Sequence, residues 1–259
     1  MHNGIALVRR PGPRLSDGLV THIERTAVDA QRAAEQHAAY RQALRDAGWD
    51  VREVTPADDF PDAAFVEDTA VFLGHRAVIT HPGDPSRRGE TASMATALTL
   101  IGVPNAELTD GTLDGGDVLR VGRRLFVGRS TRTDDDGIEA LRAVASDEGI
   151  ETFAVPVTGC LHLKTAATAL PDGTVIANLD CVDGEAFAPL DVVAAPEPEG
   201  ANVLVLDDRR VAVPQSAPET ARLVEERGFT AVALDIGEFE KVEAGLTCLS
   251  VLLGGIGAD

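Results

Sequence analysis

The chain has 259 residues, of which 44% are hydrophobic, 4% aromatic and 25% charged. This length and composition allow a sizeable buried core, and they exclude disordered and fibrous proteins. Acidic residues outnumber Lys and Arg by 42 to 23, which gives a formal net charge of -19. Electrostatic repulsion therefore excludes nucleic acid as a partner.

No segment has the composition of a signal peptide or a membrane span. The apolar core of the first ten residues is too short, and no later run approaches about 18 apolar residues. The cysteines Cys160, Cys181 and Cys248 cannot all pair with one another, and they lack the spacing of a zinc site or a disulfide framework. We therefore expect a soluble protein of the reducing cytoplasm that binds no membrane.

The chain begins with a predicted strand over residues 4–9, a helix over 23–46 and a strand over 50–54. A unit of two strands joined by a tight turn then recurs every 40 to 50 residues or so. The predicted hairpins cover residues 69–80, 117–128, 166–177 and 201–214. Helices are predicted over 88–101, 135–148 and 218–227, and a strand over 152–156.

The two ends of the chain are predicted to complete a fifth unit. Residues 4–9 and 247–253 are both strand-like, so their pairing would close a ring of five repeats within a single domain over 1–259. An open doubly wound sheet is the competing fold, but it predicts single parallel strands between helices and not repeated hairpins. The sequence also lacks a glycine-rich dinucleotide fingerprint.

Cys248 is the candidate nucleophile, because a hydrophobic strand that ends in a small polar turn can present a thiolate at its edge. His162, between two leucines, is the candidate acid and base, and Asp114 could orient it. Each residue also has an ordinary structural explanation, since cysteines pack as small hydrophobes, histidines occur in cores and Asp-Gly pairs form turns. We expect Cys160 on the same strand face as His162.

Glu67 and Asp68 stand at the start of a predicted strand, so their side chains should point to opposite faces. A buried carboxylate requires a cationic partner, either an internal arginine or a ligand. Arg87 and Arg132 lie in loops at equivalent points of two successive units. They could clamp one carboxylate, or they could be helix-start or surface residues.

Five stretches together resemble one enzyme family: residues 61–68, 82–88, 112–117, 161–164 and 240–248. They are similar to the dimethylarginine dimethylaminohydrolases, which are related to arginine deiminases and amidinotransferases. The resemblance covers nearly the whole chain. It implies a five-bladed α/β propeller with the substrate at the centre of the ring.

The resemblance also implies roles for individual residues. Cys248 would be the nucleophile, His162 the general acid and base, and Asp114 the group that holds the imidazole. Glu67 and Asp68 would hold the substrate guanidinium. The amino-acid end of the substrate would be bound by Arg87, Arg132, Asp62 and the backbone carbonyls near Leu19 and Val242.

The implied reaction converts Nω-methylated arginine to citrulline and a methylamine through a covalent S-alkylthiouronium on Cys248, without a metal or an organic cofactor. The sequence departs from the family pattern at His81, where an arginine is expected, and at Cys160. With His162 and Cys248, Cys160 could bind an inhibitory zinc ion, or it could form a disulfide under oxidation.

Several alternatives remain open at this point. The substrate could be arginine, as in a deiminase, or another small guanidine, and the chain could be a methylarginine-binding sensor without catalysis. A small-molecule guanidino compound is the expected partner in each case. The oligomeric state is open, with a homodimer as one option, and residues 15–21 form a hypothetical lid.

Overall fold

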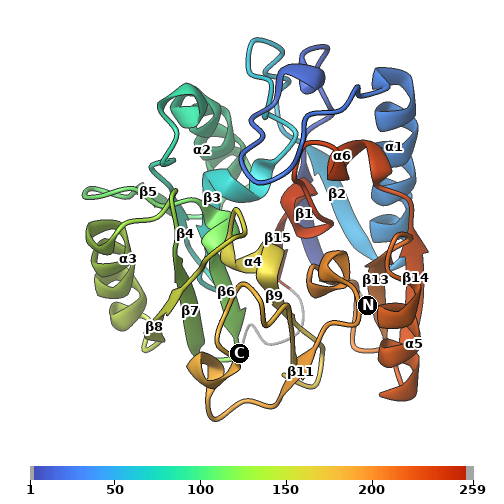
Figure 1. Ribbon diagram of the computed structural model, residues 1–259. Helices are drawn as coiled ribbons and strands as arrows, with labels where there is room; N and C mark the ends of the chain where they lie inside the picture. The colour runs from blue at the N-terminus through green and yellow to red at the C-terminus, as the bar shows by residue number, and fades with distance from the viewer. Residues whose placement is uncertain (1–2, 255–259) are drawn as a thin grey trace.

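A ring of five three-stranded sheets forms the molecule (Figure 1), whose computed structural model describes residues 3–254. In each sheet the middle strand pairs antiparallel with one neighbour and parallel with the other. The repeated unit is thus a hairpin followed by a crossover and a third strand. The predicted five-bladed α/β propeller is confirmed.

The first two sheets follow one another in the chain. They contain β3 (Ala70–Phe72), β4 (Ala77–Ile79) and β5 (Asn105–Glu107), then β6 (Val118–Val121), β7 (Arg124–Arg129) and β8 (Glu151–Pro156). The next two contain β9 (Ala167–Ala169), β10 (Val175–Ala177) and β11 (Val192–Ala194), then β12 (Leu204–Val205), β13 (Arg210–Pro214) and β14 (Thr230–Leu234). The last sheet joins β15 (Val251–Gly254) to β1 (Gly4–Val8) and β2 (Trp49–Glu53).

Four longer helices connect the middle strand of a sheet to its third strand and lie at the outside of the ring (Figure 1). They are α1 (Ala30–Asp46), α2 (Thr91–Leu100), α3 (Asp135–Asp147) and α5 (Pro218–Glu226). Between β10 and β11 the crossover contains only the 3-10 turn η5 (Gly184–Phe187). No helix among residues 3–254 combines the length and the apolarity needed to cross a membrane.

The ring closes where the first strand meets the last. β1 pairs antiparallel with β15, from Gly4 opposite Gly254 to Leu7 opposite Val251, and β15 lies against β3 of the next unit. The predicted pairing of the two chain ends is therefore confirmed. Clusters of buried hydrophobic side chains lie between the sheets and helices, and one of them contains Tyr40 of α1 together with Trp49 and Phe239.

The first helix is shorter than predicted. It begins at Ala30, not at residue 23, because the Asp29 carboxylate accepts hydrogen bonds from the backbone N–H groups of Gln31 and Arg32 and so caps the helix at that point. The chain between residues 21 and 27 is instead exposed and without regular structure. The remaining helices agree with the prediction to within a few residues.

A single short turn precedes the first strand of every unit. These turns are η2 (Val66–Thr69), η4 (Gly115–Asp117), α4 (Leu163–Ala166), η6 (Pro198–Ala201) and η7 (Thr247–Leu249), and they lie next to one another around the axis. Three strand predictions are therefore wrong: Glu67 and Asp68 lie in η2, His162 is the residue before α4, and Cys248 lies in η7. Because the turns occupy equivalent places in a ring, their side chains meet at its centre.

Three further 3-10 or short helical segments lie outside this pattern. They are η1 (Leu15–Asp17), η3 (Pro85–Glu90) and α6 (Gly237–Glu240). Segment η3 occupies the first part of the predicted helix over 88–101, since the Asp84 side chain caps it and Pro85 occupies its first turn. This places Arg87 inside the turn with its side chain buried.

Candidate active site

A cavity of about 20 Å³ lies at the centre of the ring, beside the turns that precede the first strands. Its wall is formed by Leu19, Asp62, Phe65, Asp68, Arg87, Arg132, Leu161, His162, Val242, Glu243, Ala244 and Cys248. Eight of the ten predicted site residues are on this wall. The other two are Asp114, which lies behind His162, and Glu67, which faces a different cavity.

The Cys248 thiol is buried at this wall, where Sγ accepts a hydrogen bond from the backbone N–H of Gly245 at 3.4 Å. Burial raises the pKa of the Cys248 thiol well above its ordinary value, and the negative charges of Glu67 and Asp68 raise it further. The thiol is therefore protonated in the empty site. A cation that entered the cavity would oppose both carboxylates and favour the thiolate.

The His162 imidazole lies between two carboxylates. Its Nε2 is 3.0 Å from Oδ2 of Asp114, and its Nδ1 is 3.9 Å from Oδ1 of Asp68. Burial lowers the pKa of His162, but the charge of Asp68 and the hydrogen bond to Asp114 outweigh it and raise the pKa to about 9. The imidazole is thus held as the cationic acid at neutral pH.

The loop that contains Asp114 is fixed by hydrogen bonds to buried groups. Oδ1 of Asp114 accepts a hydrogen bond from the backbone N–H of Gly83, and the backbone N–H of Asp114 donates one to Thr133. Asp117 accepts one from the backbone N–H of Leu163, directly after His162. Burial raises the pKa of Asp117 to about 6. Asp117 was not among the predicted site residues, although it ends the same Asp-Gly-Gly-Asp motif.

Gly116 allows the imidazole and Asp68 to approach the backbone closely. Its N–H donates a hydrogen bond to Oδ1 of Asp68 at 2.9 Å. A Cβ at this position would lie 2.7 Å from Nδ1 of His162 and 2.7 Å from the same Asp68 oxygen. A glycine is therefore required here for space and not for its backbone angles.

Asp68 is paired with the buried side chain of Arg87. The NH1 group of Arg87 donates a short hydrogen bond to Oδ2 of Asp68. Burial raises the pKa of Asp68, but the charges of His162 and Arg87 outweigh burial and lower the pKa to about 2. A buried carboxylate was predicted to pair with either an internal arginine or a ligand. Asp68 pairs with an internal arginine, Arg87.

The two arginines on the wall differ in how many of their donors are occupied. Besides Asp68, Arg87 donates hydrogen bonds to the Glu90 carboxylate and to the backbone carbonyls of Asp62 and Phe65. The guanidinium of Arg132 makes no hydrogen bond to the described residues, and its NH1 is 3.9 Å from Asp114. Arg132 therefore offers most of its donors to a ligand.

Glu67 points to the opposite side of η2 from Asp68. Its carboxylate contacts Nζ of Lys164 at 2.6 Å and accepts a hydrogen bond from Oγ1 of Thr247 at 2.7 Å. Burial raises the pKa of Glu67, although the Lys164 ammonium acts in the other direction. Glu67 and Lys164 line a cavity of about 220 Å³ that does not include Cys248. Lys164 was not predicted as the cationic partner of Glu67.

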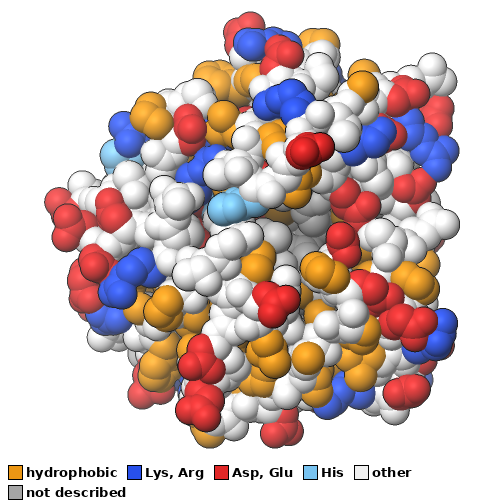
Figure 2. All heavy atoms as spheres, in the orientation of Figure 1, with side chains coloured by type: hydrophobic (Ala, Val, Ile, Leu, Met, Phe, Trp, Pro, Cys, Tyr) orange, Lys and Arg blue, Asp and Glu red, His pale blue; other side chains and the backbone are white. Residues whose placement is uncertain are grey.

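Leu19 and Asp62 line the inner cavity and contact one another. The backbone N–H of Leu19 donates to both oxygens of the Asp62 carboxylate, at 3.1 and 3.2 Å. Burial raises the pKa of Asp62, while the charge of Arg87 lowers it less strongly. A larger cavity of about 430 Å³ shares Leu161, Glu243 and Ala244 with the inner one. Figure 2 shows this face of the molecule, hollowed near its centre and rich in acidic side chains.

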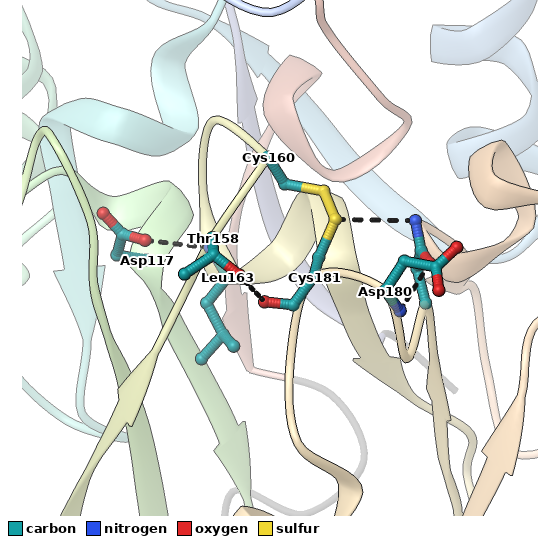
Figure 3. Close-up of a disulfide and its surroundings, with 7 residues drawn as sticks. Asp117, Thr158, Cys160, Leu163, Asp180 and Cys181 are labelled. Carbon is teal, nitrogen blue, oxygen red and sulfur yellow. Dashed lines mark hydrogen bonds between the residues drawn. A yellow bond between two sulfur atoms is a disulfide. The ribbon is translucent and has the colours of Figure 1, made fainter.

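The cysteine nearest to His162 is not free. Cys160 forms a disulfide with Cys181 (Figure 3), and both line the larger cavity. The prediction that Cys160 lies beside His162 on one strand face is wrong, because these residues form a loop and the Cys160 sulfur turns toward Cys181. In this state Cys160 cannot supply a thiolate to a zinc ion with His162 and Cys248, so the proposed inhibitory zinc site is not formed.

Asp68, Asp114 and His162 offer ligand atoms within 4.8 Å of one another, a spacing that a metal ion could use. However, Asp68 already accepts hydrogen bonds from Arg87 and Gly116, and Asp114 from Gly83. A metal ion at this point would have to displace the proton of His162 and compete with those donors. The arrangement is better suited to holding a charged imidazole.

Sequence and structure comparisons agree on one family. Residues 14–188 match the family described as arginine deiminase. An N(G),N(G)-dimethylarginine dimethylaminohydrolase from Streptomyces coelicolor is 49% identical over 249 residues, which are 96% of each chain. The enzyme of that name from Pseudomonas aeruginosa is 31% identical, over 95% of this chain and 97% of its own.

Solved structures give the same result. The Pseudomonas aeruginosa enzyme complexed with citrulline superposes with a TM-score of 0.90 at 29% identity, over 97% of this chain and 100% of its own. A dimethylarginine dimethylaminohydrolase adduct with S-methyl-L-thiocitrulline gives a TM-score of 0.91 at 29% identity, with the same coverage. The chain therefore belongs to the arginine deiminase family and, within it, to the dimethylarginine dimethylaminohydrolases.

Proposed function

We propose that the protein hydrolyses asymmetric dimethylarginine and monomethylarginine to citrulline and the corresponding methylamine. The observation that best supports this is the meeting of one thiol, one cationic imidazole and one carboxylate on the wall of the inner cavity: Cys248, His162 and Asp68. The relatives named dimethylarginine dimethylaminohydrolases, and the citrulline bound to one of them, support the choice of substrate.

In the first half of the reaction, the substrate guanidinium enters beside Asp68 and lowers the cost of forming the Cys248 thiolate, whose proton leaves to solvent. The thiolate attacks the guanidinium carbon and forms a tetrahedral adduct. Protonated His162 then donates its proton to the methylated nitrogen, and the C–N bond breaks. The products of this half are the free amine and an S-alkylthiouronium on Cys248.

In the second half, neutral His162 accepts a proton from a water molecule that attacks the thiouronium carbon. The new tetrahedral adduct collapses with loss of the Cys248 thiolate, and the hydroxyl proton of the adduct passes to that thiolate, which leaves citrulline, the Cys248 thiol and protonated His162. Asp114 keeps the imidazole oriented through both halves, because its carboxylate contacts Nε2. Every proton and electron pair in these steps is supplied by the chain, the substrate or water.

Of the remaining residues, some are proposed to bind the amino-acid end of the substrate and others to hold the carboxylates of the site in place. Arg132 has open donors for the α-carboxylate, and Arg87 acts mainly by fixing Asp68. Asp62 accepts the α-ammonium in exchange for the N–H of Leu19, assisted by the carbonyls near Leu19 and Val242. Glu67 holds the guanidinium indirectly, since its carboxylate is paired with Lys164.

Arginine deimination is the second candidate, because the matching family is described as arginine deiminase. The same thiol, imidazole and carboxylate would serve, with ammonia as the leaving group. A further guanidine substrate, or a sensor that binds methylarginine without turning it over, would also use this cavity. The cytoplasmic location, the single domain over 1–259, the absence of any cofactor and the option of a homodimer stay predictions.

The test is to incubate the purified protein with asymmetric dimethylarginine, monomethylarginine, arginine and agmatine in separate reactions that contain a metal chelator. Citrulline together with dimethylamine or methylamine is the expected result. The variant Cys248→Ser is the control, and it should bind substrate without releasing amine. Ammonia from arginine alone would favour the deiminase, and binding without product in the unaltered protein would favour the sensor.

A further inference from the structure

The segment over residues 18–23 separates the inner cavity from the larger one. Leu19 lines the inner cavity, whereas His22 and Ile23 line the outer one. An inner cavity of about 20 Å³ has room for roughly one water molecule and not for an amino acid. The segment must therefore move outward before any substrate of the proposed kind can enter.

The side chain of Glu243 holds this segment from the opposite side of the opening. One carboxylate oxygen accepts a hydrogen bond from the backbone N–H of Thr21 at 2.6 Å, and the other accepts one from the backbone N–H of His22. Glu243 lines both cavities, and its neighbours Val242 and Ala244 line the inner one. The contact thus joins the covering segment to the wall that leads to Cys248.

The backbone of Glu243 supports a specific role for this carboxylate. Its φ angle is 59°, which is the left-handed region, and Glu243 is the sole residue other than glycine with a positive φ in the described chain. Glycine would adopt this conformation without a steric penalty. This glutamate occupies a strained backbone position at the opening of the site, and both of its carboxylate oxygens accept hydrogen bonds from one segment. A function of the side chain explains the choice of residue better than the backbone conformation does.

We infer that Glu243 is a latch: its carboxylate holds residues 18–23 closed over the bound substrate and is a positioning residue for the reaction. The inference rests on the proposed function. Asp62 also holds this segment in the empty site, through the N–H of Leu19. When the substrate ammonium occupies Asp62, that hydrogen bond is lost, and the two hydrogen bonds accepted by Glu243 continue to hold the segment, together with the packing of Val20 against the core.

Limited proteolysis of the unliganded protein tests the latch without any assay of activity. Trypsin cleaves after arginine, and Arg25 follows the segment and bonds to the carbonyls of Ser16 and Gly18. Cleavage after Arg25 should be about tenfold faster in Glu243→Gln, which loses one charge-assisted pair of hydrogen bonds. Saturating L-citrulline should slow cleavage much more in the unaltered protein than in the variant.

The matched control is Glu240→Gln. Glu240 lines the same outer cavity and has the same charge, but its carboxylate accepts a hydrogen bond from Ser216 and none from residues 18–23. This variant should show the cleavage rate of the unaltered protein. Equal acceleration in both variants would show that loss of negative charge, not the latch, is responsible, and an unchanged rate in Glu243→Gln would also overturn the inference.

Kinetics provides the second measurement. Glu243→Gln should raise KM for asymmetric dimethylarginine about tenfold with a much smaller change in kcat, since the closed segment stabilises the bound substrate. Glu243→Gly relieves the left-handed backbone, so it should keep the thermal midpoint while raising KM at least as much. Unchanged KM in both variants would refute the latch. If no substrate is turned over by the unaltered protein, the proposed function fails while the proteolysis result still decides the latch.

Discussion

The imidazole of His162 is protonated, as it is in a cysteine–histidine ion pair, whereas the thiol of Cys248 is also protonated and so differs from the thiolate of such a pair. The charges of Asp68 and Asp114 favour the imidazolium, while burial and the charges of Glu67 and Asp68 disfavour the thiolate. The site is thus prepared to donate a proton before it has a nucleophile. The arrival of a guanidinium changes this balance, which favours cationic substrates over neutral amides.

The pH dependence of turnover should show the acid role of His162. Its pKa lies near 9 in the folded protein, above the ordinary value of 6.5, so the protonated form is present below about pH 9 and lost above it. We expect kcat to fall with rising pH, at or below about pH 9, because kcat reports the enzyme–substrate complex and the bound guanidinium opposes part of the Asp68 charge that raises this pKa. Asp114→Asn removes one of the groups that raise this pKa, and should move the fall to lower pH. Steady-state kinetics between pH 6 and 10 or so would measure both profiles, and coincident profiles would contradict the assignment.

Arg87 and Arg132 should respond differently to truncation. Arg132→Ala removes donors that are open to a ligand, and should raise KM by tenfold or more at nearly unchanged stability. Arg87→Ala leaves Asp68 and Glu90 buried without their partner, and should lower the free energy of unfolding by about 3 to 5 kcal/mol. Urea unfolding and substrate titration would separate the effects. Equal losses of stability would show that the contrast drawn from the hydrogen bonds is wrong.

At the scale of elements, the strands and longer helices could be predicted from the sequence, whereas the short 3-10 and helical turns could not. Hairpins such as β6 and β7 consist of two short apolar runs on either side of Gly122, and α3 follows the capping residue Asp134, so their positions follow from composition, turn residues and capping. A turn of three or four residues has no period. The residues of η2, α4 and η7 were therefore predicted as parts of the neighbouring strands. The chemical roles of Asp68, His162 and Cys248 could nevertheless be recognised from their residue types and motifs.

The disulfide between Cys160 and Cys181 joins the loop before α4 to the loop before η5, with 21 residues of sequence separation. A closed loop of this length restricts the unfolded chain by about 3 kcal/mol in the chain-entropy model. Cys160→Ser should therefore lower the free energy of unfolding by about that amount under non-reducing conditions. Adding a reductant should bring the unaltered protein to the same value and leave the variant unchanged. A reductant effect of equal size in the variant would exclude this disulfide as the cause.

At the scale of the molecule, the closed ring could be predicted from the spacing of the hairpins. The contacts that cover the site could not, because they join residues that are far apart in the sequence. Leu19 and Glu243 lie 224 positions apart in the sequence and on one cavity wall in the structure. Nothing in the residues around Glu243 indicates the left-handed backbone or the contact with residues 21 and 22. The sequence motifs identified the residues proposed to take part in the reaction. The contacts of residues 18–23 depend instead on how the folded ring brings the two ends of the chain together.

The excess of acidic residues over the whole surface should affect association with a cationic substrate. With a net charge of -19 and acidic side chains around the hollowed face (Figure 2), a guanidinium is attracted over a distance comparable to the Debye length. We expect kcat/KM for monomethylarginine to fall several-fold between about 10 and 500 mM salt, mostly through KM. Stopped assays at several ionic strengths would measure this. A salt-independent kcat/KM would show that the surface charge has no part in capture of the substrate.

The pairing of β1 with β15 also affects the order in which the enzyme can be assembled in the cell. Ribosomes extend the chain from its N-terminus, and Cys248 and β15 follow every other described strand and helix. Until they emerge, β1 keeps one unpaired edge and η2 lacks the turn that packs beside it. A nascent chain that lacks them therefore has neither a closed ring nor a nucleophile, so the active site can form only after all of the other described strands and helices have been made.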